Sequence, residues 1–196
     1  MQDLYDWIYR QSPAHVGIPL KATGLVLGLL LVAKHLWAWL RAEDSMRMAK
    51  QFPRSRTWGI ALLFVDTVWS MFLVTHMDMG EFYTWRQWIT ILVPVSFVLI
   101  VVYVPEFLAV RALGTLLLLL AQPVLDAAYL RQPTTRLLLP ILAYAWILGG
   151  MFMIGMPYLM RDAITWLTQT TNRWKIAALA GAAYGALVLL AALVGY

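Results

Sequence analysis

The sequence predicts an all-α protein: a polytopic transmembrane helical bundle with six spans and no soluble domain. Three observations support this prediction. Of the 196 residues, 62% are hydrophobic and only 13% are charged, and the apolar residues gather in six long runs. Ordinary soluble domains contain about 45–50% apolar and about 25% charged residues. The composition therefore excludes a water-soluble globule and a nucleic-acid-binding domain and, because cysteine is absent, a disulfide-stapled secreted domain.

Each apolar run is long enough to cross a membrane, since about 20 residues of helix cover about 30 Å of hydrocarbon. Helices are expected because a segment in lipid must satisfy its own backbone hydrogen bonds. No long segment separates two spans, so the chain is treated as one transmembrane domain. We place the spans at residues 16–40, 57–77, 88–104, 112–130, 137–160 and 176–196.

The boundary between the third and fourth spans depends on Val104, Pro105 and Glu106. A proline followed by a carboxylate disfavours a helix interior and favours a tight turn. Without a turn at this point the chain would have five spans, and one end would lie on the other side of the membrane.

Basic residues divide unequally between the two sides that six spans define. The side richer in Lys and Arg is normally cytoplasmic. We therefore expect a multi-pass protein of the cell inner membrane, with both termini on the non-cytoplasmic side. The richer side holds Arg41, Arg47, Lys50, Arg54, Arg56, Arg111, Arg161, Arg173 and Lys175, and the other holds Arg10, Lys21, Arg86, Arg131 and Arg136.

Asp66 is the main functional candidate, because a charge inside the bilayer costs about 2.5–3.5 kcal/mol. It lies near the middle of the second span, and Lys34 lies at a similar depth in the first. If these spans are antiparallel neighbours, Lys34 pairs with Asp66 and His35 lies beside them. Trp69 and Ser70 follow one turn later on the same face as Asp66. The site is either a structural ion pair or a proton or cation site in which Asp66 titrates.

A second polar face is predicted on the fourth span. Gln122, Asp126 and Tyr129 recur at intervals of three to four residues and so share one side of a helix. Asp126 lies near the outer surface, where Arg131 or Arg136 could neutralise it. Either Asp126 is simply a solvated or paired carboxylate, or this face and Asp66 together form part of a polar route across the membrane.

Small residues at helical spacing predict where helices approach closely, because hydrophobic burial drives little association in lipid. Ala177, Gly181 and Gly185 follow this pattern in the last span, and Gly24 and Gly28 follow it in the first. They pack either against another helix of this chain or against another subunit.

The edges of the spans carry residues typical of membrane anchoring. Residues 2–10 predict a short amphipathic helix on the membrane surface, with Leu4, Trp7 and Ile8 on one face and Asp3, Asp6 and Arg10 on the other. Tryptophans form belts at span edges. The belt on the side predicted to be cytoplasmic contains Trp37, Trp39, Trp58, Trp166 and Trp174.

Metal and cofactor signals are weak. His76, Met77 and Met79 lie close together at the outer end of the second span, and His15 could join them around a transition metal. Their spacing matches no specific motif, so we assign no metal site. No two histidines lie at the same depth in the membrane, so a haem held by two histidines of this chain is not expected. His35 alone could still be the single ligand of a haem or pigment shared with a partner. We assign no cofactor and leave a bound lipid open.

No nucleophile, zinc or phosphate-loop motif occurs at a working spacing, so the chain is not expected to be an enzyme. The net charge of +5 is explained by loops that face anionic lipid and requires no nucleic acid. The first hypothesis is a structural or partner-binding subunit of a larger membrane complex. Its partners would be lipids and other membrane subunits or a second copy of the chain. The alternative is a small transporter or channel for protons, cations or a small solute that uses Asp66.

Overall fold

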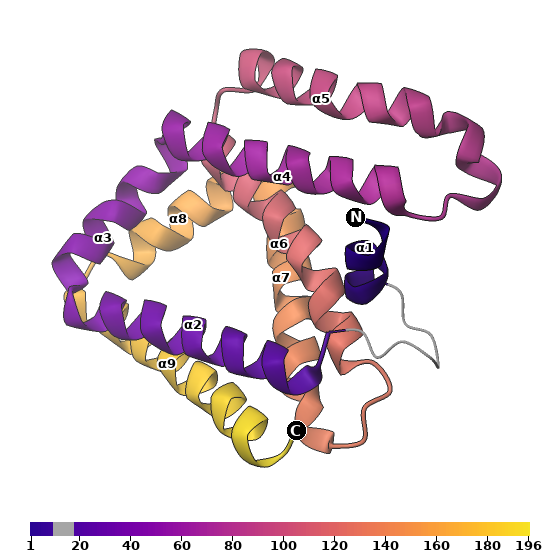
Figure 1. The fold of residues 1–196 in the computed structure, drawn as a ribbon. Helices are drawn as coiled ribbons and strands as arrows, with labels where there is room; N and C mark the ends of the chain where they lie inside the picture. Colours follow the sequence, from indigo (N-terminus) through magenta and orange to yellow (C-terminus); the bar gives the residue numbers. More distant parts are fainter. Residues whose placement is uncertain (10–17) are drawn as a thin grey trace.

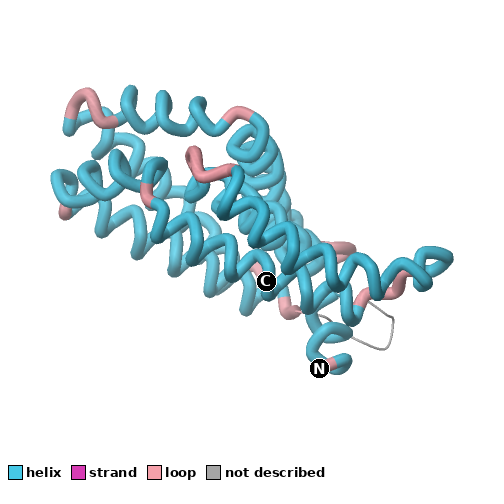
Figure 2. The backbone as a smooth tube through the Cα atoms, turned by 90° about the horizontal axis from the view of Figure 1, so that it is seen from above, coloured by secondary structure: helices cyan, strands magenta, loops and turns pink. Residues whose placement is uncertain are grey.

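The computed structural model describes residues 1–9 and 18–196, and within these ranges all regular structure is helical. Six of its helical segments are long and apolar enough to cross a membrane, which confirms the predicted fold class and the number of spans. Short loops join the helices, and no strand appears among the described residues (Figure 2). The chain is therefore a multi-pass, all-helical membrane protein.

The long helices are joined by shorter ones at their ends. Two of these, α3 and α8, lie together at one end of the molecule, and both chain ends lie away from them (Figure 1). We call that end the α3/α8 side. The elements are α1 (Gln2–Tyr9), α2 (Leu20–Leu40), α3 (Ala42–Gln51), η1 (Phe52–Arg54), α4 (Arg56–His76), η2 (Gly80–Trp85), α5 (Arg86–Tyr103), α6 (Leu108–Ala128), η3 (Thr134–Leu137), α7 (Leu138–Gly155), α8 (Pro157–Leu167) and α9 (Thr171–Val194).

Prolines set two helix boundaries on the α3/α8 side. The predicted turn at Pro105 is present: α5 ends before it, and Phe107 adopts a left-handed conformation with φ of 54° just before α6 begins. The structure therefore has the six predicted spans and not the alternative of five. The fifth span is shorter than predicted, because Pro157 lacks a backbone N–H and begins the separate helix α8.

Helices α2 and α9 form an antiparallel pair through their glycines. A Cβ on Gly28 would lie 2.8 Å from the backbone N of Leu189, and one on Gly185 would lie 2.9 Å from the backbone N of Val32. Gly24 and Gly181 make similarly close contacts along the same line between α2 and α9, and we call these four glycines the glycine seam. These four glycines therefore serve packing within this chain, and Ala177 beside them is half-buried.

Helix α6 is the centre of a second group of helices. Its Leu108 and Ala109 lie against Gly59, so α4 and α6 pack closely near their first turns, on the α3/α8 side. On its other side, Gly114 faces Gly150 of α7, and a Cβ on Gly114 would lie 2.8 Å from the Gly150 carbonyl oxygen. Helix α5 covers α4 from outside and contributes no buried residue.

The two groups of helices meet mainly at the end away from α3 and α8. There the Tyr184 hydroxyl donates to the Leu138 carbonyl at 2.6 Å, and the Tyr196 hydroxyl donates to the Thr135 carbonyl at 3.0 Å. A buried cluster that includes Leu20, Ala121, Val124, Leu139 and Val188 joins the same helices. At the opposite end α3 and α8 connect the groups (Figure 1).

Candidate functional site

Asp66 lies in the interface between α4 and α6. The buried residues of α4 are Gly59, Leu63 and Asp66, whose spacing places them on one face of the helix, and Leu63 packs with Leu108 and Ala112 of α6. Only 2% of Asp66 is exposed, so its carboxyl group points into the protein and not into acyl chains.

Neither carboxylate oxygen of Asp66 has a hydrogen-bond partner among the described residues. A buried polar group without a partner costs about 1–3 kcal/mol, and a charged one costs more. Such a group persists when function requires it or when a proton, an ion or water satisfies it. Asp66 is therefore the residue of the spans that calls most clearly for a chemical explanation.

The predicted pairing of Asp66 with Lys34 is wrong. The segment between the two spans forms helix α3 and turn η1, which hold α2 and α4 apart (Figure 1). Helix α2 packs on α9 instead, because the glycine seam lets those two backbones approach closely. Lys34 is consequently exposed and lies on a different helix pair from Asp66.

His35 is also remote from the α4–α6 interface. Its Nδ1 lies 2.8 Å from the Leu31 carbonyl oxygen, and its ring lies against Gly181 of α9. The histidine fills the space that the missing glycine side chain leaves. Its predicted place beside Asp66 is therefore wrong, whereas Ser70 is half-buried one turn beyond Asp66 on α4.

Trp69 connects the Asp66 region to the amino-terminal helix. Its indole Nε1 donates to the Tyr9 hydroxyl at 2.6 Å, and α1 contacts both α4 and α6. Burial raises the pKa of the Tyr9 phenol, the bond from Trp69 lowers it, and nearby Tyr5 and Asp126 raise it further. Tyr9 therefore lies between Trp69, which belongs to the predicted Asp66 site, and the carboxylate of Asp126 on the second polar face.

The second polar face is only partly assembled. Asp126 is half-buried near Tyr9, but Gln122 is exposed, and Tyr129 follows the end of α6 and is 61% exposed. Sequence patterns left open whether the two polar faces meet. Trp69 and Asp126 approach the same part of the molecule through Tyr9, whereas Gln122 and Tyr129 take no part.

Tyr5 and Tyr9 are site residues that the sequence pattern missed. Helix α1 was predicted to lie on the membrane surface, and the structure adds that Tyr5 and Tyr9 dock it onto the protein, with Tyr5 stacked on His76. Leu4 and Trp7 remain about half exposed, at 48% and 49%. The spacing of the two tyrosines, four residues apart on one helix face, is the signal that could have revealed this contact.

Arg111, which directly precedes the predicted fourth span, belongs to helix α6 in the structure. It lies in the first turn of α6, where its Nη1 donates to the Ile154 carbonyl at 2.7 Å near the end of α7. A cation there satisfies a carbonyl that the helix itself leaves without a donor. Arg111 therefore joins the ends of α6 and α7 on the α3/α8 side.

The weak metal candidates do not form a cluster in the described residues. No three His, Cys, Asp or Glu side chains gather there in a way that could hold an ion. The His76 ring packs between Tyr5 and Phe72, and its Nδ1 lies 2.8 Å from the Phe72 carbonyl oxygen. Met77 and Met79 follow the end of α4, and His15 lies outside the described residues.

Replacing Tyr9 with phenylalanine is expected to loosen α1. The change removes the acceptor of the Trp69 N–H and costs about 1 kcal/mol of docking free energy, or about a fivefold rise in the undocked population. Hydrogen–deuterium exchange of the α1 amides in detergent measures this population. Tyr83→Phe is the matched control, because Tyr83 is exposed. Equal exchange in wild type and Tyr9→Phe would contradict the contact.

The same docking depends on pH in one direction. Because burial raises the pKa of Tyr9, the docked state favours the neutral phenol. The stabilisation that the neutral phenol gives to docking is fully present below the ordinary tyrosine pKa of about 10 and is lost as the pH rises through the elevated value. Wild type is expected to show this alkaline step in exchange, and Tyr9→Phe is expected to lack it.

A comparison with known protein families, curated proteins and solved structures found no match for this chain.

Proposed function

We propose that the chain is an integral membrane subunit with a structural or partner-binding role in a larger membrane complex. The observation that supports this most directly is α5, a membrane-length helix without a buried residue. Phe97 faces α4, where its ring lies 6.5 Å from that of Phe64. The opposite side of α5 is left open for another helix or for lipid.

The open side of α5 has the spacing of a helix-packing seam. Its large side chains recur at alternating intervals of four and three residues, which is the pattern that interlocks with a neighbouring helix. Polar side chains are absent from this series. The residues, with their exposed fractions, are Trp88 (63%), Leu92 (60%), Val95 (44%), Leu99 (48%) and Val102 (58%).

Photo-cross-linking in native membranes tests this role. A photoreactive amino acid at Leu92 or Leu99 is expected to link the chain to another membrane protein or to a second copy. The same group at Phe97, which faces α4, is expected to give only links within the chain. Light scattering in mild detergent should give a mass above that of one 22.3 kDa chain. A single-chain mass together with no link from Leu92 or Leu99 would refute the proposal.

A second candidate function, a small transporter or channel for protons, cations or a small solute, is favoured by one observation. Asp66 is buried at a helix interface, and neither of its oxygens has a donor within the described part of the chain. Intramembrane carboxylates of this kind commonly mark ion or proton pathways. Flux into proteoliposomes, compared between wild type and Asp66→Asn, tests this role. Equal flux in the two would remove Asp66 from any transport mechanism.

We also infer that the protein belongs to the cell inner membrane, with its α3/α8 side in the cytoplasm. The basic residues of α3, η1 and α8 support this orientation, because the cytoplasmic side is normally the richer in Lys and Arg. Arg111, at the start of α6, lies on the same side. Labelling of single cysteines from outside the cell decides it, since the chain has no cysteine of its own.

A further inference from the structure

A cavity of about 510 Å³ lies on the α3/α8 side, between α2, α3, η1, α4 and α9. It occupies the wedge where α3 and η1 hold α2 away from α4. Among the described residues that line it, Lys34 carries the only charge, and Trp37, Trp58 and Trp174 are three of the four aromatic side chains. The cavity thus combines one cation with a mainly apolar wall.

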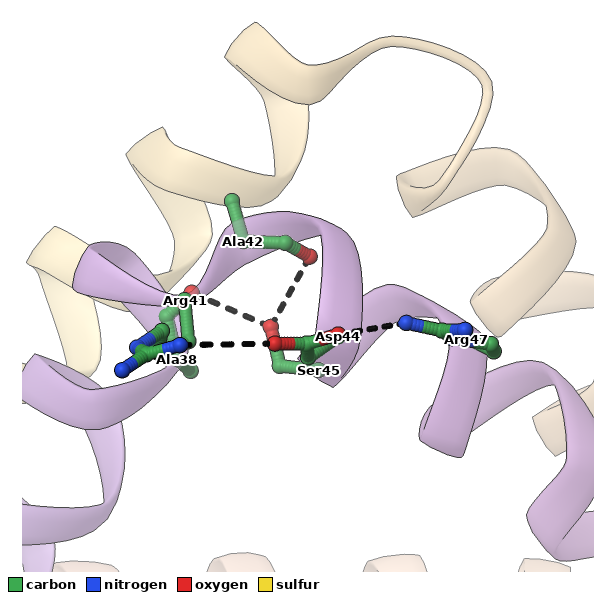
Figure 3. Close-up of polar contacts among 6 residues, drawn as sticks. All are labelled: Ala38, Arg41, Ala42, Asp44, Ser45 and Arg47. Carbon is green, nitrogen blue, oxygen red and sulfur yellow. Dashed lines mark hydrogen bonds and ion pairs between the residues drawn. The ribbon is translucent and has the colours of Figure 1, made fainter.

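Lys34 has no acidic partner among the described residues, and no Asp or Glu lines the cavity. Asp44, on the neighbouring helix α3, is held by Arg41 and Arg47 instead (Figure 3). Because a cation inside a membrane span is costly without a counter-charge, the site calls for an anion from elsewhere.

One wall of the cavity is rigidly built. The Trp174 indole Nε1 lies 2.8 Å from the Ser45 hydroxyl oxygen and 3.2 Å from the Ala38 carbonyl oxygen. Ser45 also bonds to the carbonyls of Ala38 and Ala42 at the α2–α3 corner, as Figure 3 shows. The tryptophan, α2, α3 and α9 are thereby held together at this point.

Two indole donors remain available to an occupant. The Nε1 groups of Trp37 and Trp58 have no hydrogen-bond acceptor in the described residues, and these side chains are 45% and 54% exposed. Tryptophan side chains prefer the level where lipid headgroups meet acyl chains. Lys34 lies six residues from the end of α2, about 9 Å along the helix axis, and its long side chain can extend back toward that level.

From this arrangement we propose that the cavity binds one anionic phospholipid of the leaflet on the α3/α8 side. The lipid phosphate accepts hydrogen bonds from the Lys34 ammonium group, and the ester region accepts them from Trp37 and Trp58. The first methylene groups lie against the apolar wall that includes Met48 and Ala49. A soluble anion fits this site poorly, since the lining is mainly apolar and its charged residue, Lys34, lies within the membrane-spanning helix α2.

The experiment titrates delipidated, detergent-purified full-length protein with phosphatidylglycerol or phosphatidylcholine and counts bound lipids by native mass spectrometry. Wild type is expected to bind one phosphatidylglycerol more tightly than phosphatidylcholine. Lys34→Gln is expected to weaken that binding about fivefold, the value expected for one basic residue at a membrane surface. Lys50→Gln is the matched control: it removes a cation from the same side of the membrane but does not line the cavity.

A second variant, Ala49→Phe, fills the cavity without changing the charge and is expected to reduce binding of both lipids. Inorganic phosphate in excess is expected not to displace phosphatidylglycerol. The proposal is overturned if Lys34→Gln and Lys50→Gln bind the lipid equally well, if wild type shows no preference for the anionic lipid, or if inorganic phosphate displaces it.

Discussion

Replacing Gly181 with leucine is expected to separate α2 from α9 and to lower the free energy of unfolding in detergent by about 3 kcal/mol. Any Cβ at position 181 would overlap the ring of His35, which lies directly on the glycine. His35 has little room to move, because its Nδ1 also contacts the Leu31 carbonyl. The loss is measured as a lower thermal midpoint of the purified protein.

Two further variants show whether the effect arises at this contact. Gly149→Leu introduces the same residue into α7, where a Cβ would have only the end of Met153 nearby, at 4.0 Å, so it should change stability little. Adding His35→Ala to Gly181→Ala should recover most of what Gly181→Ala alone loses, because the smaller residue vacates the space. If Gly181→Leu is as stable as Gly149→Leu, Gly181 does not set the close approach of α2 and α9.

Replacing Asp66 with leucine is expected to raise the free energy of unfolding by about 1–3 kcal/mol. Leucine has the same side-chain branching and number of heavy atoms but no oxygen that needs a donor. Asp66 is 2% exposed, and residues 1–9 and 18–196 offer neither of its oxygens a donor. A residue kept at such a cost to stability is typical of a functional position. The thermal midpoint in detergent measures the gain.

Asp66→Asn is the matched control, because the amide keeps an unsatisfied polar group of the same shape and should gain little. If the protein transports ions, both variants lose flux while only leucine gains stability. If Asp66→Leu proves less stable than wild type, the carboxylate has a partner in the working protein, such as a bound cation. That outcome would favour transport over a purely structural role.

Predictions from local sequence patterns were correct for features that depend on a single helix. The apolar runs yielded six spans, and Pro105 ended α5 as expected, because hydrophobic length and a missing N–H act within a single segment. The predicted length of the fifth span was too great, and a single proline again explains the result. Pro157 begins the separate helix α8 and does not continue α7.

Pairings between helices were less predictable. Lys34 was assigned to Asp66 on the assumption that consecutive spans are neighbours, but α3 and η1 occupy the connection and keep α2 from α4. The glycines of the first and last spans are the residues through which α2 packs on α9. A single sequence does not show that these two sets of glycines face each other.

The sequence by itself determined that this protein crosses a membrane six times and that Asp66 lies within a span, because composition and helix length are properties of single segments. Only the tertiary structure decided that Asp66 is buried against α6 with no donor from the described residues, that Tyr9 accepts a hydrogen bond from Trp69, and that Lys34 lines a cavity and forms no ion pair with Asp66. In lipid, apolar faces resemble one another, so close backbone packing and a few polar contacts select the neighbours, and these depend on the whole chain.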